Sequence, residues 1–446
     1  PLTSFLELGV PADLSDVLAS AGITQPTPIQ AATLPDSLAG RDVLGRGRTG
    51  SGKTIAFAIP TVAALSRSKT ELVPLRPRAL ILVPTRELAA QVAETFVPLA
   101  KALGLTTAVV VGGVPYNKQI SALKQGLDVL IATPGRLEDL IKQRLCRLDK
   151  VEVSVLDEAD MMADLGFLPP VQRLLDATPA GQRMLFSATI DRAVDGLVRR
   201  YLTSPVTHEV VSTESQAATM EHHVLTVVRD QKHAVVQELA SGQGRSLLFT
   251  RTKHGAMKLA ANLTAAGIPA VDLHGDLSHR MRERNLAAYS SGKVRVLVAT
   301  DIASRGIHVD DIALVVHVDP PAEHKAYLHR SGRTARAGAS GTVVTVAMPD
   351  QRREVASLMR GAAIRPTETA VIAGAREIRD VVGPAAEYVD PEMSAALFAP
   401  EPTRSAPRRS GRPGGSSYGG AGGAQRRTGG APRADGGLGA RPRRTK

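Results

Sequence analysis

The sequence predicts two consecutive α/β domains, each built on a parallel sheet, followed by a basic tail. Short apolar runs alternate with helical patterns from about residue 41 to residue 207, and the alternation returns from about 221 to 375. The runs are almost continuously apolar, which favours strands buried on both faces, and alternation with helices favours parallel pairing. The chain has 446 residues, 43% of them apolar, which is enough for about two to three domains.

The expected domain boundaries follow changes in composition. Residues 1–40 form a helical segment that packs on the first domain, which spans 41–207, and the second domain spans 221–375. The polar, Ser/Thr-rich stretch 208–220 is the expected linker. Residues 376–446 form an extension that we expect to be disordered from about residue 402.

Each expected strand is a short apolar run next to a turn or polar segment. In the first domain the runs are 43–44, 79–83, 108–111, 128–132, 153–156 and 184–186. In the second domain they are 223–228, 246–249, 270–273, 294–298, 313–318 and 342–346. Ligands of such folds bind at the carboxyl ends of the strands, so we look for functional residues there.

Charge is concentrated in the tail. Residues 402–446 carry ten arginines and one lysine against one aspartate, which is +10 of the chain's net +12. A basic, Gly-rich tail favours a nucleic acid partner, and a tail that only aids solubility is the alternative. Because Cys146 is the single cysteine, no intrachain disulfide and no cysteine-rich metal site is possible. We find no signal peptide and no membrane-spanning run, so we expect a cytoplasmic protein without a membrane partner.

One Gly-rich stretch fits the phosphate-binding pattern G-x-x-x-x-G-K-[ST]. It reads Gly47-Arg48-Thr49-Gly50-Ser51-Gly52-Lys53-Thr54 and lies between an expected strand and an expected helix, which is the context this pattern requires. Glycines let backbone N–H groups approach phosphate oxygens, and the helix adds its positive end. Lys53 would bind the outer phosphates, and the Thr54 hydroxyl would be a ligand of Mg²⁺.

A second chemical motif ends the strand at 153–156. It is Asp157-Glu158-Ala159-Asp160, an apolar strand that leads into carboxylates. Asp157 can hold Mg²⁺ through water, and Glu158 can polarise the attacking water. Downstream of a phosphate-binding loop, this pattern predicts hydrolysis of a magnesium–nucleotide complex.

These two motifs, in this order, resemble those of the DEAD-box RNA helicases of superfamily 2, and the similarity extends over about residues 1–375. The resemblance implies two RecA-like domains and the cofactors ATP and Mg²⁺. Pro26-Thr27-Pro28-Ile29-Gln30 is similar to the family's Q motif, which implies that Gln30 selects adenine and that Phe5 stacks on it. The basic tail resembles the Arg/Gly-rich extensions of several such helicases, and the resemblance is to a bacterial type.

Turn residues, hydroxyls and guanidinium groups after several strands suit a sugar–phosphate backbone, because none of them needs to read a base edge. The resemblance implies that the RNA strand is bound by Pro84, Thr85, Arg86, Gly112, Gly113, Thr133, Pro134, Gly135, Arg136, Arg251, Thr252, Arg282 and Thr300. It implies that hydrolysis is coupled to strand separation by Asp160, Ser187, Thr189, Asp301 and His329.

The second domain resembles the family in its arginine spacing but departs from it at two histidines. His329-Arg330-Ser331-Gly332-Arg333-Thr334-Ala335-Arg336 implies that Arg333 and Arg336 are catalytic together with Lys53 and Glu158. The resemblance also implies that Gly306 binds ATP. His279 replaces the usual Gln, which predicts an altered contact, and His308 replaces the usual Asp at the ribose.

The sequence therefore predicts an RNA-stimulated ATPase that closes its two lobes and unwinds short RNA duplexes. A monomer is expected, with structured RNA as the partner and with ribosomal or RNA-decay proteins as possible further partners. Two alternatives stay open: a non-enzymatic RNA clamp or annealing protein, and a DNA helicase of the same superfamily.

Overall fold

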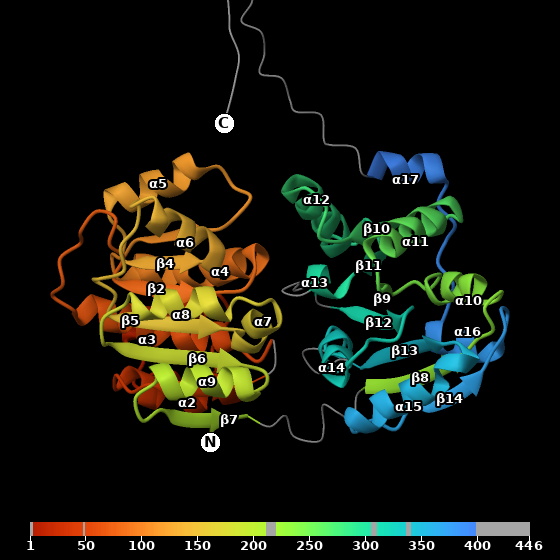
Figure 1. Ribbon diagram of the computed structural model, residues 1–446, viewed down its shortest axis with the longest axis horizontal. Helices are drawn as coiled ribbons and strands as arrows, with labels where there is room; N and C mark the ends of the chain where they lie inside the picture. Colours follow the sequence, from red (N-terminus) through yellow and green to blue (C-terminus); the bar gives the residue numbers. More distant parts are fainter. Residues whose placement is uncertain are drawn as a thin grey trace, which may run out of the picture. The chain divides into compact units, whose positions relative to one another are not determined.

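The computed structural model describes residues 3–47, 50–210, 220–304, 309, 311–335 and 340–397. Within these ranges it contains two α/β lobes, each with a parallel seven-stranded sheet (Figure 1). The prediction of two parallel α/β domains is confirmed. The tail at 402–446 and its expected disorder lie outside the described residues.

The first lobe contains strands β1 to β7 in the spatial order β3-β4-β2-β5-β6-β1-β7. The strands are β1 Val43–Arg46, β2 Ala79–Leu82, β3 Thr107–Val110, β4 Val129–Ala132, β5 Val153–Asp157, β6 Gln182–Ser187 and β7 Val206–Glu209. The helices are α1 Ala12–Ser20, α2 Pro28–Leu38, α3 Lys53–Arg67, α4 Arg86–Ala102, α5 Tyr116–Gln125, α6 Pro134–Lys142, α7 Ala159–Asp164, α8 Leu168–Asp176 and α9 Arg192–Tyr201.

The second lobe repeats this strand order as β10-β11-β9-β12-β13-β8-β14. Its strands are β8 Met220–Thr226, β9 Arg245–Phe249, β10 Ala270–Leu273, β11 Val296–Ala299, β12 Ile312–His317, β13 Gly341–Ala347 and β14 Thr367–Ala370. Its helices are α10 Lys232–Leu239, α11 Lys253–Ala265, α12 His279–Ser290, α13 Asp301–Ser304, α14 His324–Ser331, the 3₁₀ turn η2 Pro349–Gln351, α15 Arg352–Gly361, α16 Arg376–Val382 and α17 Pro391–Leu397.

Alternate residues of each strand enter different cores. In β2, Ala79 and Ile81 pack with α1 to α4, whereas Leu80 and Leu82 pack on the other face with α5 to α9. The second sheet is likewise covered on both faces by two separate cores. This double burial explains why the strands read as continuous apolar runs rather than as alternating ones.

One edge strand in each sheet has no counterpart among the apolar runs expected from the sequence. β7 pairs with β1, and β14 pairs with β8. Both are polar, and every one of their residues is partly or fully exposed. They therefore lack the apolar run that a buried strand shows. The structure places His208 and Glu209 of the expected linker in β7 and Met220 in β8.

A buried arginine joins the amino ends of three neighbouring strands in the first lobe. Arg78 is 5% exposed. Its guanidinium lies 2.8 Å from Asp128 and 3.1 Å from Glu152, and it donates to the carbonyl of Leu65 at 2.7 Å. Removing one partner of a buried ion pair is costly because the remaining charge stays in the interior.

We predict that Arg78→Met lowers the free energy of unfolding of the first lobe by about 3–5 kcal/mol. Cys146 provides a reporter for this lobe, because it is 1% exposed and burial raises the pKa of its thiol to about 12. Thiol labelling during urea titration should therefore follow unfolding of this lobe alone. The control Arg41→Ala removes an exposed ion pair with Asp36 and should shift the midpoint much less. Equal midpoints for the two variants would contradict the prediction.

Candidate functional site

The phosphate-binding loop leaves the carboxyl end of β1 and enters α3 at Lys53. Gly52 has φ +90°, and a Cβ built on it would lie 2.5 Å from Gln30 Nε2 and 2.7 Å from Thr27 Oγ1. This position therefore requires glycine both for its backbone conformation and for its close contacts. Arg48 and Thr49, which the sequence analysis assigns to ATP, lie outside the described residues.

Gln30 supports this loop from α2. Its Oε1 accepts from the backbone N–H of Thr27 at 2.9 Å, and its Nε2 donates to the carbonyl of Gly52 at 3.0 Å. The Thr27 hydroxyl donates to the carbonyl of Ser51 at 2.8 Å. Both ends of the Gln30 amide thus bind the chain, and its contact with adenine stays a prediction. Phe5 is 2% exposed and lies in the core, so stacking on a base would require its ring to move outward.

Lys53 and the acidic end of β5 form a buried charge cluster. Lys53 Nζ lies 2.8 Å from Glu158 Oε1 and donates to the carbonyl of Gly47 at 3.0 Å. Burial alone lowers the pKa of Lys53, but the charges of Glu158 and Asp157 outweigh it, so the pKa is raised. Burial, together with repulsion from Glu158, raises the pKa of Asp157 to about 7.

This cluster fits a magnesium ion. Burial first, and then the charge of Glu158, raises the pKa of Asp157, although Lys53 opposes the shift; a divalent cation beside the carboxylate would favour its charged form. Mg²⁺ at nucleotides is held by one or two protein oxygens together with phosphates and water. The Thr54 hydroxyl at the start of α3 and the Asp157 carboxylate are donors of this type. Among the described residues, no group of three or more His, Cys, Asp or Glu side chains could hold a metal by itself.

The three first-lobe residues that the sequence predicts to couple hydrolysis to strand separation meet in one hydrogen-bond network. Asp160 Oδ2 accepts from the backbone N–H of Thr189 at 2.8 Å and from its hydroxyl at 2.9 Å. Ser187 Oγ accepts from the backbone N–H of Asp160 at 3.2 Å and donates to the carbonyl of Thr189 at 2.7 Å. The acidic motif after β5 and the hydroxyl motif after β6 therefore cannot move independently.

In the second lobe Asp301 pairs with an arginine that the sequence analysis did not single out. Arg330 Nη2 lies 2.7 Å from Asp301 Oδ2, and Arg330 Nη1 donates to the carbonyl of Asp319 at 3.0 Å. Arg330 is 4% exposed, so it braces the end of α14 against the start of α13. Arg333 follows three residues later and is 7% exposed. Four predictions fall outside the described residues: those for Gly306, His308, Arg336 and the His279 side chain. The assignment of His329 to coupling stays a prediction.

The residues assigned to RNA in the first lobe follow β2, β3 and β4, which are neighbours in the sheet. Thr85 caps α4 by accepting from the backbone N–H of Leu88 at 3.2 Å, and Pro84 precedes it. Arg86 donates to the carbonyl of Gly112 at 3.2 Å. A Cβ at Gly113, where φ is +75°, would lie 2.0 Å from Arg86 Nη1, which explains the second glycine.

Thr133, Pro134, Gly135 and Arg136 form the start of α6. Arg136 Nη1 donates to the carbonyl of Val114 at 2.9 Å. A residue that the sequence analysis missed also holds this loop: the buried Gln119 donates from Nε2 to the carbonyls of Val111 and Val114. Its position on α5 carries no motif, so only the fold reveals its role.

The residues assigned to RNA in the second lobe also lie at carboxyl ends. Thr252 caps α11 by accepting from the backbone N–H of Gly255, and the backbone N–H of Arg251 donates to Asp319. Thr300 follows β11 and donates from its backbone N–H to the carbonyl of Leu273. Arg282 is 8% exposed and donates to the carbonyl of Ala303 at 2.6 Å. All four are therefore held by backbone or buried contacts.

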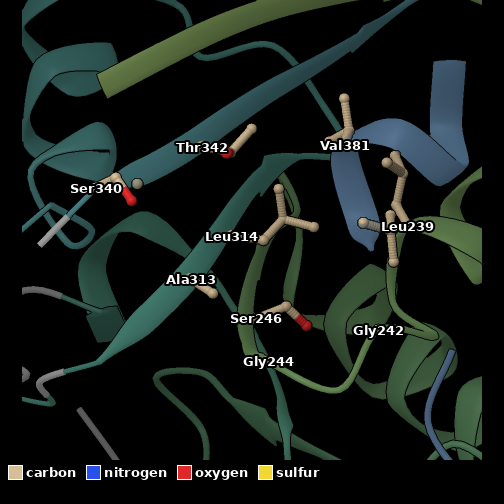
Figure 2. Close-up of a pocket in the computed structure, with 11 residues that line it drawn as sticks. Leu239, Gly242, Gly244, Ser246, Ala313, Leu314, Ser340, Thr342 and Val381 are labelled. Carbon is tan, nitrogen blue, oxygen red and sulfur yellow. The ribbon is translucent and has the colours of Figure 1, made fainter. Parts of the chain in front are cut away.

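A pocket of about 190 Å³ lies at the opposite edge of the second sheet. Its lining includes Ser246, Ala313, Leu314 and Thr342, which lie near the amino ends of β9, β12 and β13 (Figure 2). None of the residues assigned from sequence lines it. This pocket is therefore separate from the nucleotide and RNA residues.

A phosphate-binding loop beside buried carboxylates, in a chain whose two lobes are each built on a parallel sheet, is typical of nucleoside triphosphatases of the helicase class. The chain matches the family model described as DEAD/DEAH box helicase over residues 27–197. It matches the model described as Helicase conserved C-terminal domain over residues 230–338. Within the described ranges, no helix is long and apolar enough to cross a membrane.

Similar proteins agree with these matches. The chain is 37% identical over 364 residues to ATP-dependent RNA helicase RhlB of Pseudomonas syringae pv. tomato, which is 80% of this chain and 92% of that protein. It is 42% identical over 363 residues to the chloroplastic DEAD-box ATP-dependent RNA helicase 3B of Zea mays, which is 79% of this chain and 48% of that protein. It thus spans about half the length of the Zea mays relative. The chain belongs to the DEAD-box family of ATP-dependent RNA helicases.

Solved structures support the same fold. The structure described as S. cerevisiae Dbp5 bound to RNA and ADP BeF3 matches with a TM-score of 0.73 and 26% identity. The match covers 89% of this chain and 100% of that chain. The two-lobed RecA-like architecture expected from the sequence is therefore confirmed.

The loop geometry predicts that Gly52→Ala weakens nucleotide binding at least about tenfold, because the added Cβ would meet Gln30 and Thr27 in a strained conformation. Titration with a fluorescent ATP analogue measures the effect. The matched control is Gly196→Ala in α9, where a Cβ meets no atom within 4 Å. The control should bind nucleotide normally, because its added methyl group touches neither the loop nor the residues that support it. Unchanged nucleotide affinity in Gly52→Ala would contradict the assignment.

Proposed function

We propose that this protein is an RNA-dependent ATPase that separates short RNA duplexes. The observation that carries the proposal is the buried Lys53–Glu158 pair, which joins the phosphate-binding loop to the acidic motif after β5. In this arrangement the ammonium that would bind the outer phosphates neutralises the carboxylate that would polarise water. Binding of ATP would draw Lys53 to the phosphates and release Glu158 for catalysis.

Each nucleotide-binding residue then has a defined task. The loop from Gly47 to Thr54 would cradle the phosphates, and Mg²⁺ would be held by Thr54 and Asp157. Arg333 and Arg336 would stabilise the charge that develops on the transferred phosphoryl group. Because these arginines belong to the second lobe, hydrolysis would require the lobes to close, as is common for enzymes that assemble a site from two parts.

RNA would favour the same closed state. The residues after β2, β3 and β4 offer hydroxyls, glycine backbone and guanidinium groups, which suit a sugar–phosphate backbone and no particular base sequence. By linkage, ATP and RNA would each tighten the binding of the other. The network of Asp160, Ser187 and Thr189 would transmit the state of the nucleotide to the RNA side.

We predict that Glu158→Gln abolishes RNA-stimulated ATP turnover, with a loss of about 100-fold or more, because an amide cannot polarise water as a carboxylate does. The variant should still bind ATP, and its RNA affinity in the presence of ATP should persist. Phosphate release measured with and without single-stranded RNA provides the test. If RNA does not stimulate ATP turnover by the parent protein, the proposed function is refuted. Lys53→Ala serves as the control that loses nucleotide binding.

Removal of the tail distinguishes the proposed ATPase from a non-enzymatic RNA clamp that binds mainly through the tail. We predict that truncation after Glu401, which removes a net charge of +10, lowers RNA affinity at low salt and flattens its salt dependence. The truncated protein should keep ATP-dependent RNA binding through the two lobes. If truncation instead removes nearly all RNA binding, and lowers RNA affinity more than Lys53→Ala does, the RNA-clamp alternative is supported. Competition between single-stranded RNA and single-stranded DNA tests the remaining alternative, since only RNA offers 2′-hydroxyls.

A further inference from the structure

The loop after β3 and the start of α6 bring an aromatic ring against an arginine. Tyr116 is the first residue of α5, and Arg136 lies in the first turn of α6. The guanidinium carbon of Arg136 is 4.0 Å from the centre of the Tyr116 ring. Arg136 also donates to the carbonyl of Val114 at 2.9 Å. The arginine is therefore held by a ring face and by a backbone acceptor of the same loop.

The ring itself is anchored at its far end. The Tyr116 hydroxyl donates to the Asp139 carboxylate, and Asp139 Oδ1 accepts from Gln143 Nε2 at 3.0 Å. This hydrogen bond raises the pKa of Tyr116 and lowers the pKa of Asp139. Near neutral pH the pair is thus a neutral hydroxyl donor and a charged acceptor. Asp139 lies one helical turn after Arg136, so the ring spans two groups on one face of α6.

We propose that Tyr116 is a positioning residue for RNA: it fixes the guanidinium plane of Arg136 in the orientation that receives a backbone phosphate. The inference rests on the proposed function, in which Arg136 contacts the RNA strand. A guanidinium has five N–H donors, and among the described residues one hydrogen bond from Arg136 to the protein is found. Because Arg136 stacks on the Tyr116 ring through the flat face of its guanidinium, the N–H donors at the guanidinium edge stay available to a phosphate.

The physical gain is preorganisation. A long arginine side chain loses rotamer freedom when it binds a ligand, and a side chain that is already fixed loses less. Tyr116 has few rotatable bonds, and its side chain is fixed by the backbone of α5 at one end and by the hydrogen bond to Asp139 at the other. It can therefore hold Arg136 in place before RNA binds. Arg86, which donates to Gly112 of the same loop, would be aligned with Arg136 by this shared scaffold.

A direct stacking role for Tyr116 fits the geometry less well. The ring is half-buried, and Arg136 covers one of its faces. A base could stack on that face only if it displaced the arginine. Under direct stacking, Tyr116 and Arg136 would contribute to RNA binding independently, whereas under positioning the effect of Tyr116 would vanish once Arg136 is removed.

A double-mutant cycle on the full chain tests this difference. The measured quantity is the concentration of a single-stranded oligouridylate that gives half-maximal stimulation of ATP turnover. We expect Tyr116→Ala to raise this concentration about 3- to 5-fold, and Arg136→Ala to raise it at least as much. The double variant should match Arg136→Ala alone. Tyr116→Phe keeps the ring but loses the anchor to Asp139, so its effect should be smaller than that of Tyr116→Ala.

Tyr201→Phe is the matched control, because its hydroxyl also bonds an aspartate, Asp176, and its ring also lies near arginines. Tyr201 ends α9, and the control should leave the half-saturating RNA concentration unchanged. Additive effects of Tyr116→Ala and Arg136→Ala, or no effect of Tyr116→Ala while Arg136→Ala weakens binding, would overturn the positioning role alone. No effect of Arg136→Ala would instead refute the proposed RNA contact on which the inference rests.

Discussion

The buried contact of Lys53 with Glu158 and with the carbonyl of Gly47 connects the main chemical parts of the first lobe. An ammonium that is 5% exposed needs a partner, because an unpaired charge in the interior is costly. Glu158 is that partner here, and a phosphate would be an equivalent one. In the proposed function, nucleotide binding would therefore exchange one anion for another without leaving Lys53 unpaired.

Parallel sheets make this arrangement possible. Parallel strands send all their carboxyl ends to one edge, so motifs that are far apart in the chain become neighbours. Both sheets have the same strand order, although the two halves share no evident sequence repeat. Burial on both faces constrains only which residues are apolar, and many sequences satisfy that constraint.

The loop from Gly112 to Tyr116 follows β3 at the same carboxyl ends of the strands. Its backbone carbonyls accept hydrogen bonds from Arg86 in the helix after β2 and from Arg136 in the helix after β4. Gln119 of α5 donates to a further carbonyl, that of Val111 before the loop. Residues on neighbouring strands thus share one rigid support. A flexible polyanion is best recognised by donors whose positions are fixed in advance, since less entropy is then lost on binding.

The sequence by itself determined the two parallel domains, the phosphate loop, the acidic motif and the family, because buried strands and contiguous motifs are local signals. Only the tertiary structure decided the edge strands β7 and β14, whose polar residues carry no apolar run. It also decided that Gln30 braces the phosphate loop, that Arg330 pairs with Asp301, and that Tyr116 packs against Arg136. Each of these depends on a partner many residues away, and the fold alone sets which side chains meet.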